Sequence, residues 1–132
     1  MTRIKKYTET NATELMNLIE SEGEEWAPYY QEPTKQIYLD SLKKAITYLI
    51  YEDEGEQLVG YAKTLDDGLL VWIVDLLVHR EYRGKAYGKV LMDYVCEVSP
   101  NQEVYVLGGD DVLPYYDKLE YGREGVVYKV SK

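Results

Sequence analysis

The residues best suited to hold an anion lie close together between Arg80 and Lys89. This stretch carries four basic side chains against one acid, in a chain of 132 residues whose formal net charge is -9. Gly84, Ala86 and Gly88 alternate with the cations, and such small residues let a phosphate approach the backbone. Apolar spacing predicts a helix over Lys85–Val98, whose first amides point outward without partners. The stretch therefore predicts a site for a phosphate-bearing ligand.

Two common phosphate motifs do not fit this stretch. A Walker loop needs a Lys-Ser or Lys-Thr pair after its final glycine, whereas Gly88 is followed by Lys89 and Val90. A dinucleotide fingerprint would follow an early strand and precede an acid by about 20 residues. The remaining alternative is a sharp strand-to-helix turn with solvated cations, and the strand before and helix after the stretch weigh against it.

The elements that must position this site follow from the apolar pattern. Leu69–Val78 is almost wholly apolar apart from Asp75, which is typical of a strand covered on both faces at the centre of a sheet. Asn11 predicts a helix cap with Glu14 reaching back to it, and Asp53 to Glu56 predict a hairpin turn. The other expected strands are Arg3–Tyr7, Thr47–Tyr51, Leu58–Leu65, Glu103–Leu107 and Gly125–Val130. Further helices are expected from Asn11, from Thr34 and over Val112–Leu119, with a loop at Glu22–Pro33.

This order of strands and helices predicts one α/β (α+β) domain over residues 1–132, with a mixed sheet and helices on its faces. A chain of this length can bury about two-thirds of its unfolded surface, which is enough for a real core. Its 15 tyrosines, with no phenylalanine, suggest rings at core edges or in a cleft.

The composition narrows the class of partner and the compartment. An acidic chain lacks the basic footprint of nucleic-acid binding and fits a cationic small molecule or peptide better. With one cysteine, Cys96, it cannot form an internal disulfide. We find no leader pattern and no apolar run near 18 residues, so we expect a cytoplasmic protein without membrane association. No metal site is predicted.

The anion-binding stretch resembles motif A of the GNAT superfamily of acyl-CoA N-acyltransferases. That motif is Arg/Gln-x-x-Gly-x-Gly/Ala after a Leu-x-Val strand end. Here Leu76-Leu77-Val78 is followed five residues later by Arg83, with Ala86 at the first glycine position and Gly88 at the last.

A second GNAT signature, Tyr/Phe-Tyr-x-Lys-x-Gly-Tyr/Phe, resembles Tyr115 to Tyr121. Glu120 replaces its glycine, and Gly122 two residues later predicts a displaced turn. Gly109 stands where the family usually has an asparagine. The resemblance covers most of the chain and implies the GNAT fold, a central mixed sheet of six to seven strands flanked by about four helices.

The resemblance also implies a cosubstrate and a mechanism. Acetyl-CoA would lie between the strands Leu69–Val78 and Glu103–Leu107, and an amine would attack it directly in a ternary complex. The Val78 amide would polarise the thioester carbonyl, and Tyr116 would protonate the departing thiolate. The cofactor-binding residues implied are Leu76, Leu77, Val78, Arg83, Gly84, Lys85, Ala86, Tyr87, Gly88 and Lys89.

The sequence leaves the general base open. Asp75, a lone carboxylate in an apolar strand, is one candidate, and a structural hydrogen-bonding acid is its alternative. Glu24 or Glu25 acting through water is another, whereas His79 is expected nearer the diphosphate. A histone-modifying branch of the family places its base three residues earlier, at Trp72 here, so that assignment fails.

The acceptor is expected to be a cationic amine. The acceptor-binding segment of the family lies between the first two helices, and here the segment Glu22–Tyr30 offers acids and aromatic faces that suit a cation. Its candidate substrate-binding residues are Glu24, Glu25, Trp26, Tyr29 and Tyr30. A solvated loop pinned by one aromatic ring is the alternative.

The hypotheses that follow differ in class. The first is an N-acetyltransferase acting on an amine of a small molecule or peptide, as a monomer or homodimer. The second is a non-catalytic acyl-CoA-binding or sensor module of the same fold, and the third is a protein-interaction domain without a ligand.

Overall fold

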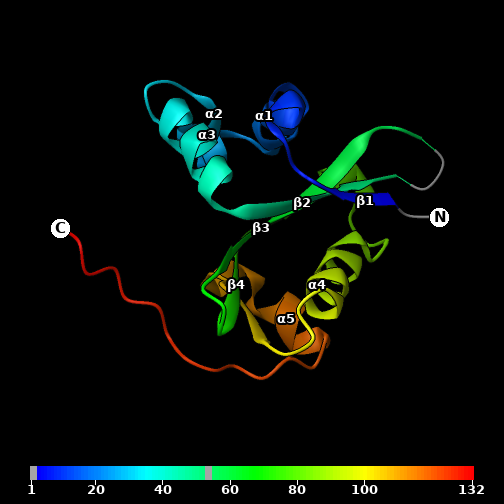
Figure 1. Cartoon of the computed structure of the whole chain (residues 1–132), viewed down its shortest axis with the longest axis vertical. Helices are drawn as coiled ribbons and strands as arrows, with labels where there is room; N and C mark the ends of the chain where they lie inside the picture. Colours follow the sequence, from blue (N-terminus) through cyan, green and yellow to red (C-terminus); the bar gives the residue numbers. More distant parts are fainter. Residues whose placement is uncertain (1–2, 53–54) are drawn as a thin grey trace.

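A five-stranded sheet runs through the middle of the molecule, with helices on both faces (Figure 1). The computed structural model describes residues 3–52 and 55–132, so the predicted turn at residues 53–56 lies partly outside the described residues. Neighbouring strands are antiparallel except for the last pair, which is parallel, and the predicted mixed α/β class is confirmed. In sheet order the strands are β1 (Arg3–Lys6), β2 (Ile46–Tyr51), β3 (Leu58–Asp66), β4 (Leu70–Val78) and β5 (Glu103–Val106).

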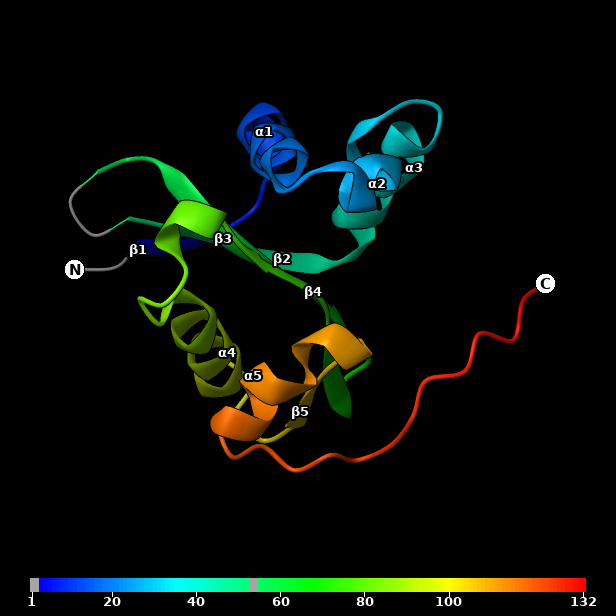
Figure 2. The same ribbon diagram turned by 180° about the vertical axis from the view of Figure 1, so that it is seen from behind.

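The helices divide between the two faces of the sheet, as Figures 1 and 2 show. The first three lie on one face and the last two on the other. Within the described part of the chain, no helix is long and apolar enough to cross a membrane. The helices are α1 (Ala12–Glu22), α2 (Ala27–Tyr30), α3 (Thr34–Lys44), α4 (Tyr87–Glu97) and α5 (Leu113–Lys118).

Each face of the sheet has its own core because successive strand residues point to opposite sides. In β2, Leu49 packs with α1 and α3 while Ile50 packs with α4, and both are fully buried. The α1–α3 face is also formed by Leu15 and Ile19, whose helical spacing gives α1 one apolar side. Strands β2 and β3 therefore hold the two layers together.

The segment predicted as a loop at Glu22–Pro33 contains helical turns. A 3-10 turn covers Glu24–Trp26 and α2 follows, with Pro28 in its first turn, where the missing N–H costs no hydrogen bond. Its aromatic rings pack against the α1–α3 core, which orders the segment.

Two further predictions differ from the structure at the sheet. Gly125–Val130 forms no strand in the described chain, and its apolar side chains are exposed, Val127 by 73%. A β-prone sequence becomes a strand only where it finds an edge to pair with, and the sheet thus has five strands here rather than six or seven. Strand β4 lies next to the edge strand β5, and Trp72 is 37% exposed, so this strand is not covered throughout.

The start of α1 also differs in detail. Asn11 does not cap the helix amides; its side chain accepts a hydrogen bond from the Thr8 amide at 3.0 Å and donates to Glu14 at 2.9 Å. Glu14 therefore contacts the Asn11 side chain rather than its backbone.

Leu91 lies at the centre of the α4 face and is fully buried. We expect Leu91→Ala to lower the free energy of unfolding by about 2 to 5 kcal/mol, because the buried methyl groups are lost and a cavity remains. Urea denaturation of both proteins would measure the change. Leu69→Ala is the matched control, since Leu69 is 71% exposed and should change stability little. Equal effects at both sites would contradict this description of the core.

Candidate active site

Strands β4 and β5 separate after four paired residues. Their parallel register runs from Leu70 opposite Glu103 to Ile73 opposite Val106, and ends where the Leu107 amide donates to the Ile73 carbonyl at 3.0 Å. Strand β4 continues to Val78 with β3 as its partner, after a register shift beside Asp75. The second half of β4 thus has an open edge on the β5 side.

The alternation of backbone groups shows which residues face this open edge. The His79 amide donates to the Val59 carbonyl at 2.8 Å, so residue 79 faces β3. In an antiparallel pair every second residue faces the partner. Leu77 therefore faces β3, whereas Leu76 and Val78 turn their peptide groups away from it. The resemblance implies the same cofactor-binding role for all three residues, whereas the structure directs only the peptide groups of Leu76 and Val78 to the open edge.

The predicted anion site at the start of α4 is formed by backbone in unusual conformations. Gly84 has φ +80° and Ala86, the residue before the helix, has φ +66°. The first intrahelical bond runs from Val90 to the Ala86 carbonyl at 2.9 Å, so the amides of residues 87–89 have no partner within the helix. No side chain caps them. The helix begins two residues later than predicted, and Tyr87 is buried in the core, so it offers the site its backbone alone.

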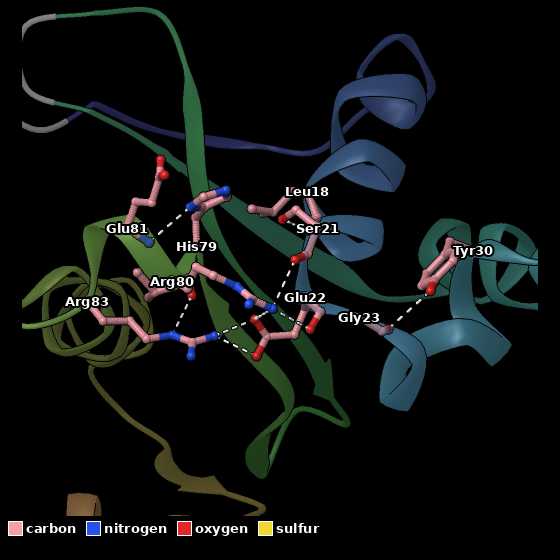
Figure 3. A network of polar contacts seen from close by, with 10 residues as sticks. Leu18, Ser21, Glu22, Gly23, Tyr30, His79, Arg80, Glu81 and Arg83 are labelled. Carbon is pink, nitrogen blue, oxygen red and sulfur yellow. Dashed lines mark hydrogen bonds and ion pairs between the residues drawn. The ribbon is translucent and has the colours of Figure 1, made fainter.

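Two of the nearby arginines bind the end of α1. Arg83 donates through Nε to the Val78 carbonyl at 2.9 Å and through Nη2 to both carboxylate oxygens of Glu22 at 2.5 Å. Arg80 donates to the carbonyls of Ser21 and Glu22 at 3.2 and 2.8 Å (Figure 3). Cations suit a helix C-terminus, where unpaired carbonyls collect negative charge. These side chains join the end of β4 to α1.

The two lysines of the stretch have different surroundings. The ammonium of Lys85 lies 5.3 Å from the centre of the Tyr82 ring, a cation–π arrangement. Lys89 pairs with Asp93 one helical turn later, at 2.7 Å. Lys85 lies just before the helix and makes no ion pair with the described residues, whereas Arg80, Arg83 and Lys89 each make one.

The two tyrosines of the second signature lie in different places. The Tyr116 ring packs over Gly108, and burial raises the pKa of its hydroxyl to about 12. The Tyr115 hydroxyl lies against Gly88 in the first turn of α4, so closely that a β-carbon on Gly88 would be 2.8 Å from it. Tyr115 therefore places a second hydroxyl at the start of α4, beside the predicted anion site. The expected displacement of the turn is wrong, since Glu120 itself adopts the left-handed conformation, with φ +64°.

Asp75 is the centre of a polar cluster on the α1–α3 face. Its side chain is 11% exposed and accepts hydrogen bonds from Tyr38 at 2.7 Å and Tyr29 at 3.3 Å. Lys63, its neighbour on β3, lies 4.0 Å away. Asp75 thus joins the cofactor strand to the predicted acceptor segment.

Within the acceptor segment, the acids and the aromatic residues behave differently. Glu24 and Glu25 are exposed, while Trp26 and Tyr29 are half-buried and meet edge to face at 5.5 Å. Tyr30 donates to the Gly23 carbonyl at 3.1 Å and so closes the segment on itself (Figure 3). The structure brings Tyr29 to Asp75 and assigns Tyr30 a structural contact.

Sequence reasoning missed the partners of Asp75. Tyr38 lies on the predicted helix from Thr34, and helical spacing alone does not indicate that its hydroxyl bonds to Asp75 and, at 2.9 Å, to Tyr61. Lys63 gave no signal, because a lysine in a strand is usually solvated. The cross-strand register, which places Lys63 opposite Asp75, is the feature that would have found it.

His79, which the resemblance leads us to expect near the diphosphate, directly follows β4. Its Nδ1 accepts the Glu81 amide at 3.1 Å, and its ring borders a surface cavity of about 280 Å³ between α1 and the β2–β3 connection. In the described residues no group of three His, Cys, Asp or Glu side chains could hold a metal ion.

The sequence of the chain matches the model of a known family. The model of the Acetyltransferase (GNAT) family matches residues 12–121. The chain belongs to the GNAT family. Uncharacterized N-acetyltransferase ycf52 of Porphyra purpurea is 28% identical over 118 residues, which cover 84% of this chain and 64% of that relative. The chain therefore spans under two-thirds of its curated relative.

Solved structures share the GNAT fold over the whole chain. Ribosomal-protein-alanine N-acetyltransferase from Brucella melitensis biovar Abortus 2308 is similar with a TM-score of 0.73 and 20% identity, covering 100% of both chains. Aminoglycoside N-acetyltransferase AAC(6')-Iy in complex with CoA has a TM-score of 0.72 and 12% identity, covering 100% of this chain and 95% of that one. At these identities the likeness shows the fold alone.

The left-handed Ala86 gives a test of the helix start. This conformation costs a residue with a β-carbon about 1 to 2 kcal/mol, whereas glycine loses about 0.5 to 1 kcal/mol more entropy on folding than alanine. We therefore expect Ala86→Gly to raise the free energy of unfolding by about 0.5 to 1 kcal/mol, measured by urea denaturation. Ala12→Gly is the control, since Ala12 has φ -58° and should become less stable. A loss of stability at both positions would contradict the left-handed conformation at Ala86.

Proposed function

We propose that this GNAT chain is an N-acetyltransferase that transfers an acetyl group from acetyl-CoA to a primary amine of a cationic small molecule or peptide. The observation that carries the proposal is the open edge of β4, which ends beside the uncapped amides of α4. An extended chain with amide groups can pair with the open strand edge. A diphosphate suits the uncapped helix amides. The pantetheine and diphosphate parts of CoA have this chemistry in this order.

The backbone and Lys85 would bind the cosubstrate. The peptide groups of Leu76 and Val78 would pair with the pantetheine, because they face away from β3. The Val78 carbonyl already accepts Arg83, which leaves its amide to polarise the thioester carbonyl as an oxyanion donor. The amides of residues 87–89 and the ammonium of Lys85 would hold the diphosphate.

Tyr116 and Asp75 would handle protons. Acetyl-CoA supplies an activated thioester carbonyl, which a neutral amine attacks. Tyr116 would protonate the departing thiolate, and its raised pKa keeps the hydroxyl protonated and able to donate at neutral pH. Asp75 would accept the proton of the acceptor ammonium, while the faces of Trp26 and Tyr29 with the acids Glu24 and Glu25 attract the cation.

A cytoplasmic location remains a prediction.

Reversing one charge at the helix start tests the diphosphate site. We expect Lys85→Glu to weaken CoA binding at least tenfold in isothermal titration calorimetry, because an anion then faces the diphosphate. Lys44→Glu makes the same charge change at an exposed position at the end of α3, on the other face of the sheet, and should keep wild-type affinity. Equal affinity in Lys85→Glu and wild type would contradict the diphosphate assignment.

Removing one hydroxyl at a time tests the acid. We expect Tyr116→Phe to reduce thiol release from acetyl-CoA about 100-fold, in the range of one general acid, without weakening CoA binding. Tyr115→Phe is the matched variant on the same helix, and it should retain most of the turnover. The reverse ranking would transfer the role to Tyr115.

The alternative is a non-catalytic acyl-CoA-binding module of the same fold. Asp75 favours it in one respect, because both its carboxylate oxygens already accept hydrogen bonds. A panel of polyamines, aminoglycosides and peptide amines decides between the two. Tight acetyl-CoA binding without thiol release in the presence of any acceptor would support the binding module.

A further inference from the structure

Lys63 is a largely covered charged residue on β3, outside every motif discussed above. Its side chain is 12% exposed, and it shares the α1–α3 face with a core of leucine, isoleucine and tyrosine side chains. It lies on β3 directly opposite Asp75, beside the register shift of the β3–β4 pair.

Three contacts fix the position of the Lys63 ammonium. It donates to the Ser41 hydroxyl at 2.8 Å and lies 4.7 Å from the centre of the Tyr38 ring. Its nitrogen is 4.0 Å from Oδ2 of Asp75. Such a constrained position differs from that of a surface lysine, whose ammonium is mobile and solvated.

The hydrogen bonds of the cluster all point toward Asp75. Tyr38 donates to Oδ2 at 2.7 Å and Tyr29 to Oδ1 at 3.3 Å. The hydroxyls of Tyr38 and Tyr61 are 2.9 Å apart, and because the Tyr38 proton is directed to Asp75, Tyr61 must donate to Tyr38. In this arrangement Asp75 accepts hydrogen bonds on both carboxylate oxygens and donates none.

The titratable groups facing Asp75 come from three elements. They are Tyr29 from α2, Tyr38 from α3, and Tyr61 and Lys63 from β3. Burial raises the pKa of each tyrosine, so these hydroxyls stay neutral. Burial lowers the pKa of Lys63, and the Asp75 charge opposes that effect. Among the described groups of this cluster, Lys63 therefore supplies the positive charge that balances Asp75.

A gain in the stability of the fold is a weak explanation for the pairing of Lys63 with Asp75 inside the protein. Burying two charges costs desolvation energy that their attraction often fails to offset, and apolar replacements are frequently neutral or stabilising. A buried ion pair next to a candidate site is better explained by chemistry. Here Asp75 adjoins Leu76, whose peptide group faces the open edge, and contacts Tyr29 of the acceptor segment.

We propose that Lys63 is a positioning residue for acetyl transfer, holding Asp75 as the anion that takes the proton of the acceptor ammonium. The inference rests on the proposed function. Lys63 acts through Asp75, because its ammonium contacts Asp75, the Ser41 hydroxyl and the Tyr38 ring.

The step balances without a further reactant. An N–H bond of the ammonium breaks, and its proton goes to Oδ1 of Asp75, where the longer bond from Tyr29 gives way. The electron pair stays on nitrogen, which attacks the thioester carbon. The C–S bond then breaks, its electron pair goes to sulfur, and Tyr116 protonates the thiolate. The second proton that leaves the nitrogen as the amide forms replaces the one that Tyr116 gave. Asp75 returns its proton to solvent.

The test compares Lys63→Met and Lys63→Arg with wild type in the pH dependence of thiol release. Methionine removes the charge at similar length, so the carboxylate is protonated more easily. We expect the acid limb of kcat/KM to move up by about one pH unit or more in Lys63→Met, with CoA affinity unchanged. Lys63→Arg should restore the wild-type profile. Lys6→Met, an exposed position on β1, is the control and should not move the limb.

A second variant and a direct titration keep the outcome decisive. If Lys63→Met does not fold, Lys63→Gln removes the same charge and retains a polar group. The pH dependence of the Asp75 carboxyl carbon signal, followed by NMR without cosubstrate, should move in the same direction as the acid limb. The inference would be overturned by a folded variant without the Lys63 charge in which the acid limb of kcat/KM and the pH dependence of the Asp75 carboxyl signal both match wild type. Failure of the proposed function would look different, as wild-type protein that releases no thiol with any amine.

Discussion

The separation of β5 from β4 is the constraint on which the rest of this structure depends. A strand in the interior of a sheet has no peptide groups to offer a ligand, because both neighbours use them. Here β4 keeps β3 along its whole length and loses β5 after Ile73. One half of the strand holds the sheet together, and the other half exposes alternate peptide groups beside the start of α4.

Charged side chains connect the end of the open edge to the other layer. Arg83 contacts the last carbonyl of β4 and the carboxylate of Glu22, and Arg80 contacts the final carbonyls of α1. Gly23 and the acceptor segment follow directly. The two halves of the candidate site, which lie on opposite sides of the sheet, are therefore joined by a single network. A connection of this kind between the two layers suits a reaction that must align two substrates.

The unusual use of tyrosine in place of phenylalanine has a physical explanation in the cores. Tyr38 and Tyr61 are buried on the α1–α3 face with their hydroxyls bonded to each other and to Asp75, and the Tyr51 hydroxyl contacts Glu14 at 2.6 Å. Buried hydroxyls with partners cost little, whereas unpartnered ones are expensive. The rings thus fill the core while their hydroxyls satisfy carboxylates that the apolar layer would otherwise leave unpaired.

The sequence by itself determined the local features of this protein. Apolar periodicity placed most helices and strands, and the small residues and cations around Gly84 marked the helix start, because these signals depend on near neighbours in the chain. Only the tertiary structure decided which side chains meet across it. Arg83 bonds to Glu22, Lys63 faces Asp75, and Gly125–Val130 has no strand partner in the described chain. Such contacts depend on sheet register and helix placement, which join residues far apart and leave no trace in local spacing.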